Sequence, residues 1–171
     1  MKILETERMT FRRLRPDDLD ALAALYRDPE IRRYFPEGTL TRAETEEELG
    51  WFRNGHPHHP QLGLWAAILK QTGAFIGRCG LLPWTIEGVA EVEIAYLIAT
   101  PYQRRGLGAE AAQALVRYGF DRLGLKRLIA LIDPAHDASI GTAMRAGLRF
   151  EKMVEMDGVT SAVYAITRRM G

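Results

Sequence analysis

The chain has 171 residues, of which 47% are hydrophobic and 26% are charged, and its formal net charge is +1. This length suits one domain with its own core, so we expect a single domain over residues 1–171. The near-neutral charge gives no broad field for binding nucleic acid or a membrane surface, and no apolar run is long enough to span a bilayer. Cys79 is the one cysteine, which excludes an internal disulfide. The charged N-terminus shows no secretory signal, and we expect a cytoplasmic protein.

The first third of the chain predicts one strand and two helices. Alternating apolar and polar residues over 8–14 predict the strand. The proline and two aspartates at 16–18 are typical of a helix first turn, and apolar residues follow at helical spacing as far as Tyr26. Thr41 with Glu44 three residues later predicts a capping box that opens the second helix.

The middle of the chain predicts three strands. Residues 62–69 and 74–84 form the two halves of a predicted hairpin, after a proline-bounded loop at 55–63 (GHPHHPQLG). Residues 89–99 then alternate, with Val92, Ile94, Tyr96 and Ile98 on one face and Glu91, Glu93 and Ala95 on the other.

The last third completes a mixed pattern. We expect the longest helix at 105–123, a buried strand at 126–133 and a short helix that ends at Gly147. Residues 149–166 predict a hairpin that turns at Asp157-Gly158. Antiparallel strands followed by one βαβ unit indicate a mixed α/β fold.

The stretch QRRGLG, residues 103–108, forms a glycine-rich turn before the longest helix. Glycines let backbone N–H groups approach a phosphate, and the helix N-terminus adds partial positive charge. The phosphate loop of nucleoside triphosphatases needs Lys and then Ser or Thr after its last glycine. Here Ala109 and Glu110 follow, which excludes that class.

A dinucleotide fold is the second alternative. Gly106, Gly108 and Ala111 fit its G-x-G-x-x-A fingerprint. However, residues 100–105 separate the preceding strand from the first glycine, and the upstream hairpins leave no room for two mononucleotide-binding halves. A different phosphate ligand is therefore favoured.

The turn also fits the Q/R-x-x-G-x-G/A signature of the GNAT acyltransferase superfamily. Five further segments occur in the order of that superfamily: TERMTFRRLRPDDLDAL, YRDPEIRRYF, IGRCGL, EVEIAYLI and HDASIGTAMRAGLRFE. Together they resemble the ribosomal-protein N-acetyltransferase branch over about residues 4–168. The resemblance implies an α/β fold of the mixed, α+β-like GNAT type, with a mostly antiparallel central sheet and one βαβ cofactor-binding unit.

The resemblance also implies an activity. We expect one N-acetyltransferase domain that moves an acetyl group from acetyl-CoA to a primary amine, by direct attack in a ternary complex and without a metal. The acceptor would be a protein N-terminus or a small amine, and a homodimer is compatible with the sequence. The alternative is a non-catalytic acyl-CoA-binding module or regulator on the same scaffold, which only a turnover measurement separates from the enzyme.

The resemblance places coenzyme A along three segments. The turn would hold the phosphates, the end of the preceding strand would pair with the pantetheine arm, and His136 stands where the family often has Asn. The predicted cofactor-binding residues are Leu97, Ile98, Ala99, Gln103, Arg104, Arg105, Gly106, Leu107, Gly108, Ala109, His136 and Ser139.

Two residues carry the predicted chemistry. The resemblance makes Glu93 the general base, acting directly or through water, with Glu91 as the fallback; the alternative is a solvated strand face. Ser139 matches a family serine that would bond the leaving sulfur, and the alternative is an ordinary helix-start residue. Other branches place a tyrosine a few residues later, where this chain has Ala143.

Other features point to less. His56, His58 and His59 lack a cysteine or acidic partner, so we expect no metal site. Cys79 lies among apolar strand residues and is expected in the core. The resemblance makes residues 32–40 the acceptor-facing loop.

Overall fold

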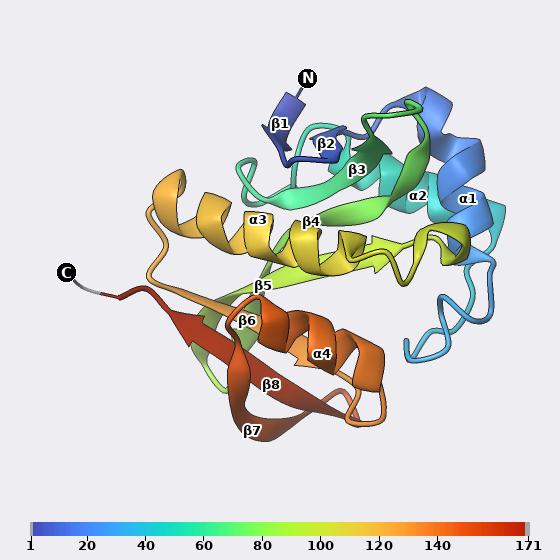
Figure 1. Cartoon of the computed structure of the whole chain (residues 1–171). Coiled ribbons are helices and arrows are strands. Elements are labelled where there is room, and N and C mark those ends of the chain that lie inside the picture. The colour runs from blue at the N-terminus through green and yellow to red at the C-terminus, as the bar shows by residue number, and fades with distance from the viewer. Residues whose placement is uncertain (1, 170–171) are drawn as a thin grey trace.

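The computed structural model describes residues 2–169 (Figure 1). Its elements in chain order are β1 (Lys2–Glu5), β2 (Met9–Arg13), α1 (Leu19–Tyr26), α2 (Arg42–Phe52), β3 (Gly63–Leu69), β4 (Phe75–Ile86), β5 (Val89–Ile98), α3 (Leu107–Asp121), β6 (Arg127–Ile132), α4 (Asp137–Arg145), β7 (Arg149–Met156) and β8 (Val159–Thr167), with short 3₁₀ helices at Pro16–Asp18 and Thr100–Tyr102. This order confirms the predicted elements and adds β1, which the sequence analysis missed.

One sheet runs through the molecule in the order β1-β2-β3-β4-β5-β6-β8-β7. Neighbouring strands are antiparallel except β5 and β6, which are parallel and joined by α3. The mixed, mostly antiparallel α/β fold with one βαβ unit is therefore confirmed.

Helices cover both faces of the sheet (Figure 1). α3 and α4 pack on one face, where Ile94 and Leu115 belong to the same buried cluster. α1 and α2 pack on the other, where Leu97 lies with Leu22 and Phe52. Since successive residues of a strand point to opposite faces, the alternation predicted for β5 is confirmed.

The parallel pair β5–β6 is short. The register joins the two strands only at Glu93 and Ile129 in the described residues, although β5 continues to Ile98 and β6 to Ile132. The C-terminal halves of these strands are thus not paired with each other. The sheet opens beside the residues that lead into the glycine-rich turn.

Local signals explain several boundaries. The capping box forms as predicted, because Glu44 N–H donates to Thr41 Oγ1 at 3.1 Å and Thr41 N–H donates to Glu44 Oε1 at 2.9 Å. The last hairpin turns at Asp157 and Gly158, which have φ of 52° and 78°. In the described residues no helix has the length and apolar character needed to cross a membrane.

Candidate functional site

The glycine-rich turn forms the N-terminus of α3. Gly106 is the N-cap of this helix and has φ of 77°, which glycine adopts without the steric cost that other residues meet. The N–H groups of the next residues have no partner within the helix, so they lie free at its positive end. A Cβ at Gly108 would meet nothing closer than the Thr142 side chain, at 3.7 Å. The two glycines leave the turn without side chains of its own at Gly106 and Gly108, which suits close approach of a phosphate to the backbone.

Arg8, near the N-terminus of the chain, binds the glycine-rich turn and the first turn of α3 through hydrogen bonds and an ion pair. Arg8 donates from Nη1 to the Arg105 carbonyl at 2.8 Å and from Nε to Glu110 Oε1 at 2.8 Å. The backbone N–H of Arg8 donates to Glu110 Oε2 at 2.9 Å. Arg8 thus fixes the direction of a carbonyl inside the turn. The sequence analysis missed this role, since nothing in the spacing joins residues so far apart.

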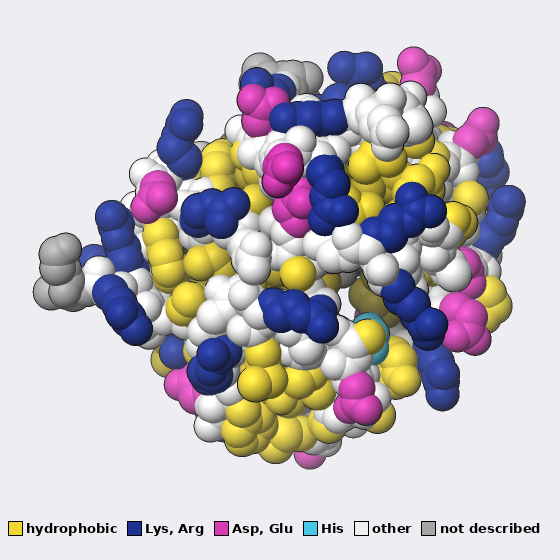
Figure 2. Space-filling model, in the orientation of Figure 1, with side chains coloured by type: hydrophobic (Ala, Val, Ile, Leu, Met, Phe, Trp, Pro, Cys, Tyr) yellow, Lys and Arg dark blue, Asp and Glu magenta, His cyan; other side chains and the backbone are white. Residues whose placement is uncertain are grey.

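Three contacts bring the predicted cofactor-binding segments together. Gln103 donates from Nε2 to the Ile98 carbonyl at 2.9 Å, which ties the turn to the end of β5. Gly108 lies against Thr142 of α4. Tyr96 of β5 donates to the carbonyl of Ser139, in the first turn of α4, at 2.8 Å. Figure 2 shows a hollow between the N-terminal ends of α3 and α4, with Lys and Arg side chains around it.

Glu93 lies where β5 leaves β6. Its carboxylate accepts a hydrogen bond from Trp84 Nε1, which lies 2.9 Å from Oε1. Burial raises the pKa of Glu93 from 4.5 to about 7, and the bond from Trp84 offsets part of that rise. A carboxyl with this pKa is partly ionised at neutral pH and still basic enough to accept a proton. The sequence analysis did not connect Trp84 with Glu93.

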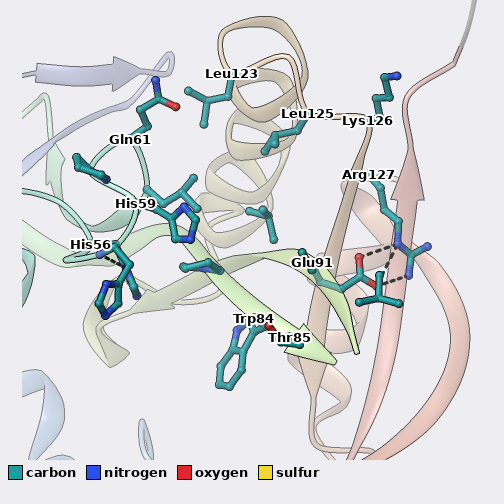
Figure 3. A pocket seen from close by; sticks show the side chains of 17 residues that line it. His56, His59, Gln61, Trp84, Thr85, Glu91, Leu123, Leu125, Lys126 and Arg127 are labelled. Carbon is teal, nitrogen blue, oxygen red and sulfur yellow. Dashed lines mark hydrogen bonds and ion pairs between the residues drawn. The ribbon is translucent and has the colours of Figure 1, made fainter. Parts of the chain in front are cut away.

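Glu91 is held in a different way (Figure 3). Arg127 donates from Nε and Nη2 to its two carboxylate oxygens, each at 2.9 Å, and also to Glu151 at 2.6 Å. The Glu91 side chain is 9% exposed. A solvated strand face therefore describes neither glutamate, since Glu91 is held in the Arg127 ion pair and Glu93 accepts a hydrogen bond from Trp84.

Ser139 lies in the first turn of α4 but does not cap it. The N-cap is His136, and no side-chain cap bond forms there. The Ser139 hydroxyl lies 3.2 Å from the hydroxyl of Tyr96. Ser139 is thus a residue of the helix start, as the alternative predicted, and its hydroxyl does not act as the N-cap.

His136 connects α4 to the predicted acceptor-facing loop. Its ring stacks on Tyr34 with centroids 4.2 Å apart and planes 14° apart. Burial lowers the pKa of His136. This stack ties residues 32–40 to the N-terminus of α4.

The three loop histidines lie elsewhere. His56, His58 and His59 line a cavity of about 810 Å³ at the start of β5, whereas the glycine-rich turn follows the end of that strand (Figure 3). His58 N–H donates to His56 Nδ1 at 3.1 Å. Over residues 2–169 no group of three or more His, Cys, Asp or Glu side chains is arranged to hold a metal. Cys79 is a buried free thiol, as expected.

Comparison with known proteins gives a consistent result. The sequence model of the acetyltransferase (GNAT) domain matches residues 8–149. The uncharacterized protein YkkB of Bacillus subtilis is 33% identical over 162 residues, which cover 94% of this chain and 93% of that protein. The uncharacterized N-acetyltransferase p20 of Bacillus licheniformis is 31% identical over 140 residues, covering 82% of this chain and 78% of that protein. The crystal structure of a GNAT-family acetyltransferase from Bacillus anthracis superposes with a TM-score of 0.81 at 24% identity and covers 98% of both chains.

Proposed function

We propose that this protein moves the acetyl group of acetyl-CoA to a primary amine, by direct attack in a ternary complex. The chain belongs to the acetyltransferase (GNAT) family. Family membership makes the protein an N-acetyltransferase. The observation that carries the proposed mechanism is Glu93, a desolvated carboxyl with a pKa of about 7 at the point where the sheet opens.

The geometry of the turn supports our proposal for the cofactor-binding residues. The N–H groups of residues 106–109 would bind the pyrophosphate, with Arg104 and Arg105 adding positive charge. The end of β5, residues 97–99, would lie along the pantetheine arm, and His136 of α4 would contact it from the other side. The left-handed backbone of Gly106, the lack of a side chain at Gly108 and the helix N-terminus fit a phosphate-bearing ligand.

The reaction needs a neutral amine and a stabilised leaving group. Glu93, directly or through water, accepts a proton from the attacking amine as the C–N bond forms. The C–S bond then breaks and its electron pair goes to sulfur, to which Ser139 donates a hydrogen bond. Since a free thiol has a pKa of about 8.5, the thiolate leaves with modest help.

The acceptor is a primary amine. The ribosomal-protein branch resembled by the sequence favours a protein N-terminus, and a small amine is the second candidate. Residues 32–40, held in place by the stack of Tyr34 on His136, would face this acceptor. We further propose that the 171 residues form one catalytic domain and that it acts in the cytoplasm without a metal, as a monomer or a homodimer.

A panel of amines tests the proposal. The purified protein is mixed with acetyl-CoA and, in turn, with peptides that carry free N-termini, amino acids, polyamines and aminoglycosides. Free thiol and the mass of each amine are then measured. We expect at least one amine to be acetylated with one thiol released per amide formed. Binding of acetyl-CoA without acetylation of any amine in the panel would contradict the proposed reaction.

A further inference from the structure

Tyr96 lies near the candidate site and has no role in the proposed reaction as described above. It lies three residues after Glu93 on β5, in the part of the strand that has separated from β6. Its ring points to the α3 and α4 face of the sheet, whereas Glu93 points to the opposite face. Tyr96 therefore lies between the predicted base and the glycine-rich turn, alongside the opening of the sheet.

The phenol of Tyr96 reaches across to α4. It donates to the Ser139 carbonyl at 2.8 Å and lies 3.2 Å from the Ser139 hydroxyl. Ala143, one turn further along α4, is fully buried and supplies no polar group. The Tyr96 hydroxyl of β5 is thus hydrogen-bonded to the first turn of α4.

The position of a bound thioester follows from the two ends of the site. Its phosphates lie at the turn after β5, and its carbonyl must come within reach of an amine that Glu93 deprotonates. The sulfur is bonded to the acetyl carbonyl carbon and lies between it and the phosphates, so it is on the side of the carbonyl that faces the glycine-rich turn. It must therefore lie beside the stretch of β5 between Glu93 and Ile98, where Tyr96 is the only hydroxyl-bearing residue.

We propose that Tyr96 is a catalytic residue: its single O–H turns from the Ser139 carbonyl to donate a hydrogen bond to the sulfur of the leaving thiolate, together with the hydroxyl of Ser139. This inference rests on the proposed acetyl transfer. As the C–N bond forms and the C–S bond breaks, the sulfur receives the electron pair and Glu93 holds the proton of the amine. The phenol keeps its proton throughout, and the proton on Glu93 passes to the thiolate or to solvent.

The surroundings of Tyr96 favour a donor that stays protonated. Burial, with a smaller contribution from the charge of Glu93, raises the pKa of Tyr96 to about 12. A hydrogen bond to an ionised sulfur is stronger than one between neutral groups, so the bond strengthens as charge develops there.

Tyr96→Phe tests the proposal because it removes only the hydroxyl. Tyr118→Phe on α3 is the matched control, since its ring packs edge-on against Trp65 and lies outside the site. Two quantities are measured: kcat at saturating acetyl-CoA and acceptor, and the pKa of the thiol of bound coenzyme A, followed by NMR of a carbon-13 label on the methylene next to sulfur.

We expect Tyr96→Phe to lower kcat about tenfold and to raise the pKa of the bound thiol by about one unit, with KM for acetyl-CoA unchanged. Tyr118→Phe should match the wild type in both. A bound thiol with the same pKa in Tyr96→Phe and wild type would overturn the proposal, even if the variant is slower or less stable. Absence of amine acetylation by the wild type would instead contradict the proposed function, and the thiol titration would still decide the role of Tyr96.

Discussion

Trp84 Nε1 lies 2.9 Å from Glu93 Oε1, and this contact brings the edge of an indole ring to the carboxyl that we propose as the base. In the register of the β4–β5 hairpin, Trp84 is opposite Glu91 and so diagonal to Glu93, on the same face. Trp84 is itself 40% exposed. Burial raises the pKa of Glu93, and the hydrogen bond from the indole N–H offsets part of that rise.

The raised pKa of Glu93 affects stability as well as catalysis. Since its pKa is about 7 when folded and 4.5 ordinarily, the folded protein binds a proton that the unfolded chain has released between these pH values. Wild-type stability should fall as pH rises from about 4.5 to about 7. Glu93→Gln has no carboxyl to titrate, so its free energy of unfolding should not fall in this way. From pH 4.5 to pH 7 it should rise, relative to that of the wild type, by on the order of 2–3 kcal/mol.

Urea unfolding of both proteins at a series of pH values measures that difference. Glu46→Gln, at an exposed position on α2, is the matched control and should follow the wild type. A constant difference between Glu93→Gln and wild type from pH 4.5 to 8 would show that Glu93 is not desolvated as described.

Gly108→Asp should weaken the binding of acetyl-CoA. The new Cβ has room beside Thr142, so the fold should survive, but a carboxylate at the helix N-terminus would repel the pyrophosphate. We expect the Kd from calorimetry to rise at least about fivefold. Gly50→Asp, on α2 with open space around the added Cβ, is the control and should bind as wild type does. Unchanged affinity for acetyl-CoA in a folded Gly108→Asp protein would show that the cofactor does not bind at this turn.

Arg8→Met should raise KM for acetyl-CoA with little change in kcat. The substitution removes the hydrogen bond that orients the Arg105 carbonyl, and that bond is charge-assisted but partly exposed. We expect an increase of about fivefold in KM. Arg42→Met breaks an exposed ion pair with Asp20 and serves as the control. An equal effect of both variants on KM would mean that Arg8 does not act through the turn.

Ser139→Ala separates catalysis from helix capping. A lost cap would cost about 1 kcal/mol of stability and leave turnover intact. Because the hydroxyl lies near Tyr96 and not at the N-cap, we expect an unchanged melting temperature and a two- to tenfold lower kcat, on the order of one hydrogen bond. The melting temperature and the kcat at saturating acetyl-CoA, measured on the same variant, distinguish a role in catalysis from a role in helix capping. Lower stability with wild-type kcat would assign Ser139 to the helix alone.

The periodic elements could be predicted because their signals are local. Alternation along β5, the Thr41–Glu44 capping box and the Asp157-Gly158 turn each depend on residues close in sequence. β1 was missed because four residues give too short a pattern to distinguish a strand from a loop.

The contacts that define the candidate site are long-range, and local patterns do not encode them. Arg8 meets Glu110 across 102 residues of sequence, and Tyr96 meets Ser139 across 43. The alternation of β5 gave Glu91 and Glu93 the same status, although Arg127 holds one and Trp84 covers the other. Only the packing of the sheet distinguishes the surroundings of the two carboxyls, and this difference supports our proposal of Glu93 as the base.

The pH dependence of kcat in wild type and Glu93→Gln, measured with an amine that the panel identifies, tests the central claim most directly. Wild-type kcat should rise with pH through about 7 as Glu93 loses its proton. Glu93→Gln should lose about 10²-fold at neutral pH, keep its affinity for acetyl-CoA, and recover in part at higher pH, where more of the amine is already neutral. The same kcat and the same pH profile in both proteins would contradict the assignment of Glu93 as the base.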